Sequence, residues 1–427
     1  MTRLEICKLI ISEIRNFIYS DACLEAHRLP KHFVRKRLLS FAHVIMYLLS
    51  ASKAKMETNI SELLESLDPD SFPSVSKQAI SKARQGILPS LFREIFQISV
   101  DLFYKNFTRK KLWHGLHVFA IDGSKIQLPN SDSNFAEFGK MFSLKNPNRE
   151  WSMALSSIVY DVLDDYIVHA SLGRYLASER SFAKQHLAEL EQLDIYKDSI
   201  VVFDRGYYSE DMFRYCAEHG HLCLMRLKKS FRMSKSCDGD TRSVLPGNTG
   251  KSSDDIDIRV IAVTLCTGET EFLATNLFDP AFTADMFREL YFLRWSIEIK
   301  YLELKEYLKL EEFNGATAVS IEQEFYITLL ISNLTALIKA DADEAISNNQ
   351  KPTNRHRYQS KRTFILSRIK KVLPQIIFGL NNPDYIDVLL EEASRTRSQL
   401  QPGRHDPRPK KSGRRERKHF NNRKAIV

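Results

Sequence analysis

Cysteine is scarce in this sequence, and its few copies show no pattern typical of a metal or redox site. The chain has six cysteines among 427 residues, at positions Cys7, Cys23, Cys216, Cys223, Cys237 and Cys266. No two are spaced as CxxC, and no set of Cys and His has zinc-finger spacing. The sequence therefore argues against a disulfide-stapled secreted scaffold and a structural zinc module, and it predicts reduced thiols.

Long hydrophobic runs are also missing. Charged residues interrupt the first twenty positions, which argues against a signal peptide; they are Arg3, Glu5, Lys8, Glu13 and Arg15. The least polar stretch, 325–338, is too short for a bilayer span and contains Ser332 and Asn333. We interpret it as a buried helix and expect a soluble, cytoplasmic protein. A hydrophobic content of 43% can supply a sizeable core, and the length suits two or three domains.

Acidic residues are rare in the C-terminal tail, 402–427. This tail has ten Lys or Arg against two acids, so it carries +8 of the formal net charge of +9. A basic, nearly apolar-free tail is typical of an arm that binds a polyanion, with Arg414 and Arg415 as candidate DNA contacts. The alternative is a solvated tail that only aids solubility.

Apolar residues recur at helical spacing through residues 1–110, which predicts a helical N-terminal region. Within it, the segment 76–84 has the composition of a helix that reaches DNA. Its candidate contacts are Lys77, Lys82 and Arg84. An ordinary packing helix is the alternative.

From 117 onward the pattern changes to strands and helices in the order strand, strand, strand, helix, strand, helix, strand. The first apolar strand, 117–122, ends in Asp122, and the fourth, 199–204, ends in Asp204. This order matches the ribonuclease-H-like fold, in which the first and fourth strands lie side by side. We therefore predict an α/β protein whose regions are helical (1–110), ribonuclease-H-like (111–340, with a β-rich insertion at about 228–282) and basic (341–427).

A long helix predicted from Thr283 to about 310 carries an unusual stripe of polar residues. At about 100° per residue, Tyr291, Arg294, Glu298 and Lys305 fall within roughly 60° of one another. A neighbouring apolar stripe of Leu293, Ile297, Leu304 and Leu308 can pack on the sheet. The alternative is a chance alignment of ordinary surface charges.

These predictions bring three carboxylates together in one cluster, and they belong to Asp122, Asp204 and Glu298. A cluster of like charges is costly unless cations occupy it. Carboxylate oxygens suit Mg²⁺ or Mn²⁺. Two such ions about 4 Å apart can activate a nucleophile and stabilise the leaving oxygen of a phosphodiester. Gly123 and Gly206 follow the two aspartates closely and leave room for backbone and substrate.

These motifs resemble those of the insertion-sequence type 4 transposases. The spacing Tyr291-x2-Arg294-x3-Glu298-x6-Lys305 is that family's Y-REK signature, and the sequences around Asp122 and Asp204 are similar to its two Asp motifs. The resemblance implies a DDE transposase with Asp122, Asp204 and Glu298 as ligands of two Mg²⁺ ions, for which Mn²⁺ can substitute. It also implies that Tyr291, Arg294 and Lys305 grip DNA, and that a homodimer joins two inverted-repeat ends and target DNA.

One departure from the family concerns tryptophan. Characterised relatives stack an extruded base on a tryptophan of the insertion, whereas the tryptophans here are Trp113, Trp151 and Trp295. Phe231 or Phe272 is the candidate substitute, and Trp295 is expected to pack. Two other functions remain open: a nuclease or resolvase of the same fold, and a non-catalytic repressor that binds transposon ends.

Overall fold

The structure of the protein is a computed structural model. This structure describes residues 1–400 except 36, 68–71, 143–145, 147–148, 194, 248–254, 266–267, 352 and 378–383. The chain divides into two compact units. The helical unit comprises 1–108, 126–153 and 304–427, and the α/β unit comprises 109–125 and 154–303. These units differ from the three consecutive regions expected from the sequence, because chain segments on both sides of the α/β unit fold together.

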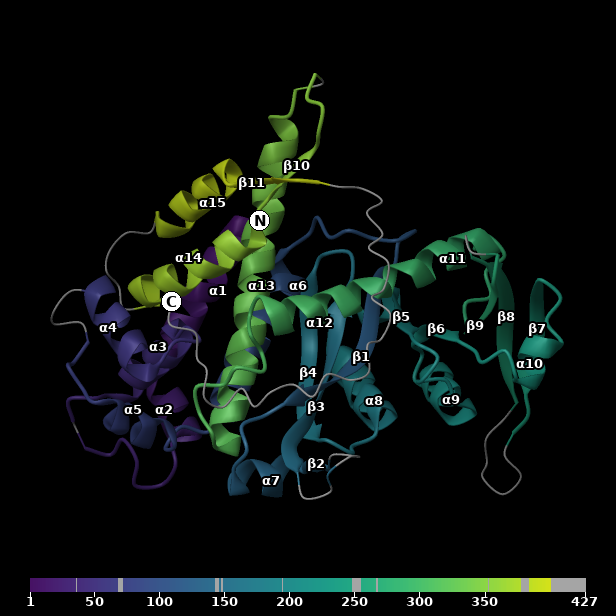
Figure 1. Cartoon of the computed structure of the whole chain (residues 1–427). Coiled ribbons are helices and arrows are strands. Elements are labelled where there is room, and N and C mark those ends of the chain that lie inside the picture. The colour runs from purple at the N-terminus through teal and green to yellow at the C-terminus, as the bar shows by residue number, and fades with distance from the viewer. Residues whose placement is uncertain are drawn as a thin grey trace. The chain divides into compact units, whose positions relative to one another are not determined.

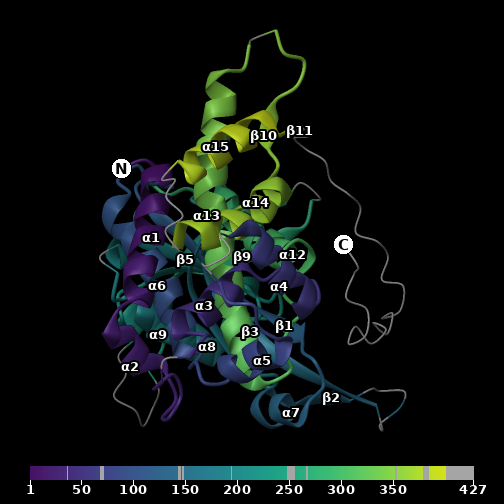
Figure 2. The ribbon, with the colours of Figure 1, turned by 90° about the vertical axis from the view of Figure 1, so that its left-hand side faces the viewer.

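The helical unit is built around one long helix, α13 (Ala318–Asn348). Around it are α1 (Arg3–Ile18), α2 (Asp21–His27), α3 (Phe41–Ser50), α4 (Met56–Ser66), α5 (Lys77–Arg84), α6 (Ser90–Asn106), α7 (Asp132–Phe138), α14 (Arg362–Ile377) and α15 (Tyr385–Arg395), with short strands β2 (Lys140–Phe142), β10 (Tyr358–Ser360) and β11 (Arg397–Gln399). Helices α1, α6, α14 and α15 contact α13, and Figure 2 shows α13 running through this unit.

Helix α13 contains the apolar stretch 325–338 that the sequence singles out. It is long and apolar enough to cross a membrane, but 83% of its apolar window is buried. The prediction of a buried helix is confirmed. The sequence of α1 also explains its start and its packing. Thr2 caps α1 through a capping box with Glu5, and the buried apolar residues of α1 recur at helical spacing.

The α/β unit contains a twisted mixed sheet (Figure 1). Its strands are β1 (His117–Gln127), β3 (Glu150–Asp161), β4 (Tyr166–Arg174), β5 (Ser199–Phe203), β6 (Leu222–Arg226), β7 (Asp240–Leu245), β8 (Ile256–Thr264) and β9 (Thr270–Thr275). Its helices are α8 (Glu179–Leu190), α9 (Glu210–Glu218), α10 (Arg232–Lys235), α11 (Ala284–Leu293) and α12 (Trp295–Glu306). Some of these elements extend into residues of the helical unit.

The strand order confirms the ribonuclease-H-like core. The path is β4–β3–β1–β5–β6, with β3 and β4 antiparallel and β1, β5 and β6 parallel. The β-rich insertion is not a separate sheet, because β9 pairs antiparallel with β6 and the path continues through β8 to β7. Buried side chains of β1, β5, β6, β8 and β9 pack against Phe287, Leu290 and Tyr291 of α11.

Two local features differ from the sequence-based expectation. Strand β1 continues past Asp122 to Gln127, so Asp122 lies within the strand instead of at its end. The helix predicted from Thr283 to about 310 is interrupted at Arg294, where α11 gives way to α12. Around this point Arg294 N and Ile297 N donate to carbonyls three residues back, which is a tighter turn than an α-helix makes.

Candidate active site

Asp122, within β1, and Asp204, directly after β5, lie at the same level of two neighbouring parallel strands. The last residue pair between β1 and β5 is Ile121 with Phe203, and Asp122 and Asp204 are the residues that follow. Both side chains are half-buried. The five residues before each aspartate are buried and mostly apolar, so the sheet fixes where the two carboxylates emerge. The predicted meeting of these two strands is confirmed.

Asp122 is surrounded by groups that orient it. Its Oδ1 accepts a hydrogen bond from Gly123 N at 2.9 Å, and its carbonyl oxygen accepts one from the Tyr301 hydroxyl at 3.2 Å. The pKa of Asp122 is raised to about 7, mainly by burial and to a smaller extent by Glu179 and Asp204, while the Gly123 N–H and Arg294 oppose the shift. This carboxylate is therefore poised to exchange a proton for another cation near neutral pH.

Tyr291 links the helix to the second aspartate. Its hydroxyl donates to Asp204 Oδ1 at 3.1 Å, and the side chain is buried in the core beneath α11. Burial is the main reason that the pKa of Tyr291 lies well above its usual value, so the hydroxyl stays protonated and remains a donor.

Glu298 is held by Arg294, one helical turn before it. The Arg294 Nη2 lies 2.8 Å from Glu298 Oε1, with the arginine side chain 3% exposed and the glutamate side chain 41% exposed. The guanidinium carbon lies 4.9 Å from the centroid of the Trp295 ring and 5.6 Å from that of Tyr291. Arg294 Nε is buried and has no hydrogen-bond partner among the described residues.

The three acidic side chains are of a chemical type that binds divalent metal ions. Asp122, Asp204 and Glu298 supply hard carboxylate oxygens, and Asp204 lies near enough to raise the pKa of Asp122, a repulsion that a cation relieves. Across the described part of the chain, however, no three Asp, Glu, His or Cys side chains are close enough to hold an ion together. Glu298 faces Arg294 here, so the three carboxylates are not preassembled around one point.

Several residues of the site were not singled out from the sequence. Glu179, the first residue of α8, lies against Gly123: a Cβ on that glycine would stand 3.2 Å from Glu179 Cγ. Arg180 holds the loop after Asp204 by donating to Gly206 O and Tyr208 O at 3.0 Å. Tyr301 lies three residues after Glu298, and the helical pattern around Glu298 was the one signal that could have found it. No local sequence pattern identifies Glu179 or Arg180, because only tertiary folding brings them to the site.

The remaining predicted contacts are spread over the chain. Lys305 belongs to the helical unit, where its ammonium lies 3.8 Å from Glu311. Lys77 and Lys82 are exposed on α5, and Lys77 is paired with Glu57. Arg414 and Arg415, together with the predicted tail, lie outside the described residues.

One prediction needs correction. Arg84 is 2% exposed and binds Glu324 and Gln323 inside the helical unit, so it is not a surface contact for DNA. Trp295 is 37% exposed, and its ring centroid lies 4.9 Å from the guanidinium carbon of Arg294, so the expectation that it packs and does not stack a base stays a prediction. Of the two candidate substitutes for the family's tryptophan, Phe231 is half-buried against Tyr208, and Phe272 is half-buried within β9.

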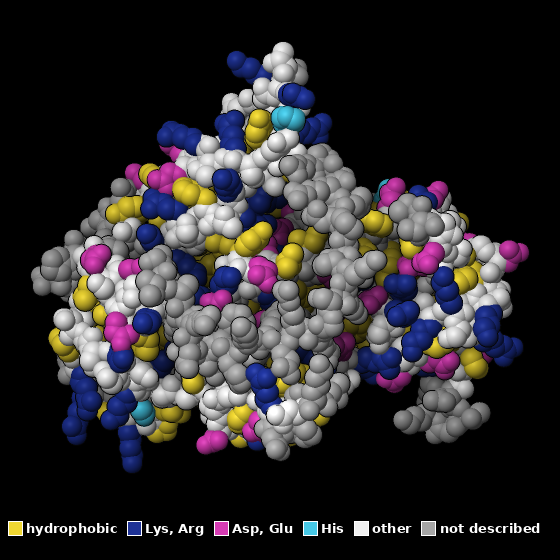
Figure 3. All heavy atoms as spheres, in the orientation of Figure 1, with side chains coloured by type: hydrophobic (Ala, Val, Ile, Leu, Met, Phe, Trp, Pro, Cys, Tyr) yellow, Lys and Arg dark blue, Asp and Glu magenta, His cyan; other side chains and the backbone are white. Residues whose placement is uncertain are grey.

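A basic face on the extended sheet was also missed. Figure 3 shows Lys and Arg side chains gathered over α10 and β7. The exposed cations of segment 228–242 are Lys228, Lys229, Arg232, Lys235 and Arg242. Two of them lie over aromatic rings, Lys228 near Phe231 and Arg242 at 4.7 Å from the Phe278 centroid. Cations interleaved with aromatics are typical of nucleic-acid contacts.

Comparisons with known proteins agree with this arrangement. Residues 113–334 match the family described as "Transposase DDE domain". The chain is 24% identical over 323 residues to the transposase InsG for insertion sequence element IS4 of Escherichia coli K12, covering 70% of each protein. It is 27% identical over 140 residues to the putative transposase InsZ of the same organism, covering 32% of this chain and 44% of that protein.

Among solved structures, the chain is similar to the piggyBac transposase in its synaptic complex with hairpin DNA. The TM-score is 0.47 at 11% identity, over 95% of this chain and 87% of that one. The family match covers more than half of the chain and includes Asp122, Asp204, Tyr291, Arg294 and Glu298. The chain therefore belongs to the DDE transposase family, enzymes that cleave and transfer DNA strands with the help of divalent metal ions.

Proposed function

We propose that this transposase cuts and rejoins DNA at the ends of an insertion sequence, using Asp122, Asp204 and Glu298 as its metal-binding carboxylates. The observation that carries the proposal is the alignment of β1 with β5, which makes Asp122 and Asp204 neighbours. Tyr291 and Arg294 then connect Asp204 and Glu298 to the same pair of helices. Two Mg²⁺ ions, or Mn²⁺ in their place, would supply nucleophile activation and stabilisation of the leaving oxygen.

The protein's own residues position these groups. Tyr291 restrains Asp204, Tyr301 and Gly123 restrain Asp122, and Arg294 restrains Glu298. The planar guanidinium of Arg294 also suits a phosphate oxygen next to the cut. Together they account for orientation of the carboxylates and for one contact to the DNA backbone.

Positive charge identifies the candidate DNA contacts outside the catalytic centre. We propose that Lys305, the exposed Lys77 and Lys82, and the tail with Arg414 and Arg415 bind phosphates of the inverted-repeat ends and target DNA. The basic face over α10 and β7 joins this set. A homodimer that holds two ends together, acting at the bacterial nucleoid, completes the proposal.

Cleavage of a labelled duplex that carries the element's own terminal repeat tests this function. The assay compares Mg²⁺, Mn²⁺ and EDTA for the wild type and for Glu298→Ala. Glu289→Ala is the matched control, because Glu289 is an exposed acid on the preceding helix, α11.

We expect metal-dependent nicking at the repeat boundary that Glu298→Ala abolishes and Glu289→Ala retains. Metal-dependent cutting without preference for the repeat would instead identify a nuclease or resolvase. Binding of the repeat without cleavage in either metal would identify an end-binding repressor.

A further inference from the structure

Three cations and one carboxylate line a cavity inside the helical unit, which contains none of the three carboxylates assigned to DNA cleavage. Lys53 follows α3, Arg84 ends α5, Lys370 lies on α14, and Glu324 lies on α13. All four line one cavity of about 20 Å³, which has room for one or two water-sized atoms. The charged side chains that line the cavity therefore carry a net charge of +2 when all are ionised.

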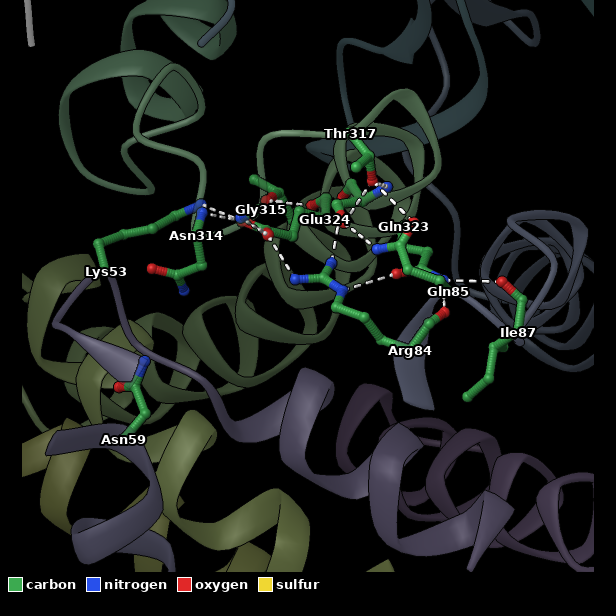
Figure 4. Close-up of polar contacts among 12 residues, drawn as sticks. Lys53, Asn59, Arg84, Gln85, Ile87, Asn314, Gly315, Thr317, Gln323 and Glu324 are labelled. Carbon is green, nitrogen blue, oxygen red and sulfur yellow. Dashed lines mark hydrogen bonds and ion pairs between the residues drawn. The ribbon is translucent and has the colours of Figure 1, made fainter. Parts of the chain in front are cut away.

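Glu324 accepts hydrogen bonds from three donors, which Figure 4 shows. Its Oε1 accepts from Gly315 N at 2.9 Å and from Arg84 Nη1 at 3.2 Å, and its Oε2 accepts from Asn314 N at 2.8 Å. Lys53 Nζ lies 3.6 Å from Oε2. Burial alone would raise the pKa of Glu324, but Lys53, Arg84 and the two amides hold it below its usual value. The glutamate stays ionised and has little capacity left for a third cation.

Lys370 is that third cation. It forms no hydrogen bond or ion pair with a described residue. Burial, with a smaller contribution from Lys53, lowers its pKa to about 8, although Glu324 opposes the shift. The ammonium is still mostly protonated at pH 7, so it brings an uncompensated positive charge to the wall of the cavity.

The Tyr47 hydroxyl is a second donor without a partner at the same cavity. The side chain is 1% exposed and lines the cavity, and no described residue accepts a hydrogen bond from its hydroxyl. Asn59 lies nearby but is committed to the loop after α3: its Oδ1 accepts from Ser52 Oγ at 2.7 Å and its Nδ2 donates to Ser52 O at 3.1 Å. A buried hydroxyl left in this way costs free energy unless a ligand accepts from it.

We propose that this cavity binds one small inorganic anion of chloride size, held by Lys53, Lys370 and the Tyr47 hydroxyl. A volume of about 20 Å³ suits a single ion of this size. An anion cancels part of the buried positive charge and accepts the free hydrogen bonds of Lys370 and Tyr47. Of the nearby acids, Glu312 is paired with Lys309 at 3.9 Å and Glu324 already accepts from three donors. The site ties α3, α13 and α14 together and makes the stability of the helical unit depend on the anion.

Thermal unfolding of the full-length protein tests the proposal. The melting temperature is measured in potassium chloride and in potassium glutamate at equal ionic strength, because glutamate is too large for the cavity. The variants are Lys370→Met and Tyr47→Phe, and the second removes only one oxygen atom. Lys371→Met is the matched control, because Lys371 is the exposed neighbour of Lys370. Comparing each variant with the wild type in the same salt cancels the general effect of that salt.

We expect chloride to raise the melting temperature of the wild type and of Lys371→Met, relative to the two cavity variants, by about 2 °C and in a saturable way. Crystals grown in bromide should show an anomalous peak beside Lys370 Nζ. Equal responses of all four proteins to the two salts would overturn the proposal and leave a water-filled cavity. A difference between wild type and variants that short duplex DNA removes and chloride does not would also overturn it, in favour of a backbone phosphate.

Discussion

The guanidinium of Arg294 lies 2.8 Å from the carboxylate of Glu298 and is partly covered by the rings of Tyr291 and Trp295. The arginine occupies the one-residue break between α11 and α12, so the last turn of one helix and the first turn of the next meet at this ion pair. Arg294 therefore controls where the glutamate points before a metal or substrate enters.

Replacing Arg294 should separate the contribution of its positive charge from that of its planar geometry. Arg294→Gln removes both the ion pair and the planar cation, and we expect cleavage of a terminal-repeat duplex to fall by about 10²-fold or more. Arg294→Lys keeps the charge but loses the fixed fork geometry and should recover only part of that loss. Single-turnover cleavage rates measure both. Arg288→Gln, which changes an exposed arginine of α11, is the control; an equal loss in that variant would contradict a specific role for Arg294.

Asp122 makes stability depend on pH in a definite direction. Its pKa is raised from 3.8 to about 7 in the folded protein, so between these pH values the folded state binds more protons than the unfolded state. Stability is therefore lost as pH rises through this window. Asp122→Asn should stabilise the metal-free protein above pH 7 by about 1–3 kcal/mol and have little effect below pH 4. Urea unfolding at the two pH values measures this, and an effect of equal size at both would rule out the proposed cause.

Much of this centre follows from the sequence because its signals are local. The apolar runs before Asp122 and Asp204 predict two buried strands, and helical periodicity brings Tyr291, Arg294 and Glu298 to one face. The burial of Arg84 could not be predicted, because its partner Glu324 lies 240 residues further along the chain. The pairing of β6 with β9 could not be predicted for the same reason, because no local sequence pattern specifies which strand pairs with the edge of a sheet.

Tyr291→Phe tests whether the hydroxyl restrains Asp204. The variant loses one buried hydrogen bond of 3.1 Å, which should lower the free energy of unfolding by about 1 kcal/mol. We expect a larger effect on catalysis, about tenfold on the single-turnover cleavage rate, with little change in affinity for the terminal repeat. Tyr307→Phe, at an exposed tyrosine, is the control. A changed affinity with an unchanged rate would show that Tyr291 binds DNA and does not position Asp204.

Arg84 and Lys82 are two cations of the same helix with opposite expected behaviour. Arg84→Ala leaves Glu324 with an unfilled position inside the helical unit and should lower the free energy of unfolding by about 3–5 kcal/mol. Lys82 is exposed, so Lys82→Ala should barely change stability but should weaken DNA binding and reduce its salt dependence. Denaturant unfolding and salt-dependent DNA titration distinguish them. Reduced DNA affinity of a fully folded Arg84→Ala protein would return this residue to the DNA-binding surface.

The most direct test of the central claim is metal rescue of cysteine variants. Asp122→Cys, Asp204→Cys and Glu298→Cys each replace a carboxylate with a softer ligand, which accepts Mn²⁺ more readily than Mg²⁺. Cleavage of the terminal-repeat duplex is measured for each variant in both metals. If these three residues hold the catalytic metals, each variant is inactive in Mg²⁺ and regains part of its activity in Mn²⁺. Equal activity in the two metals for folded variants would contradict the assignment.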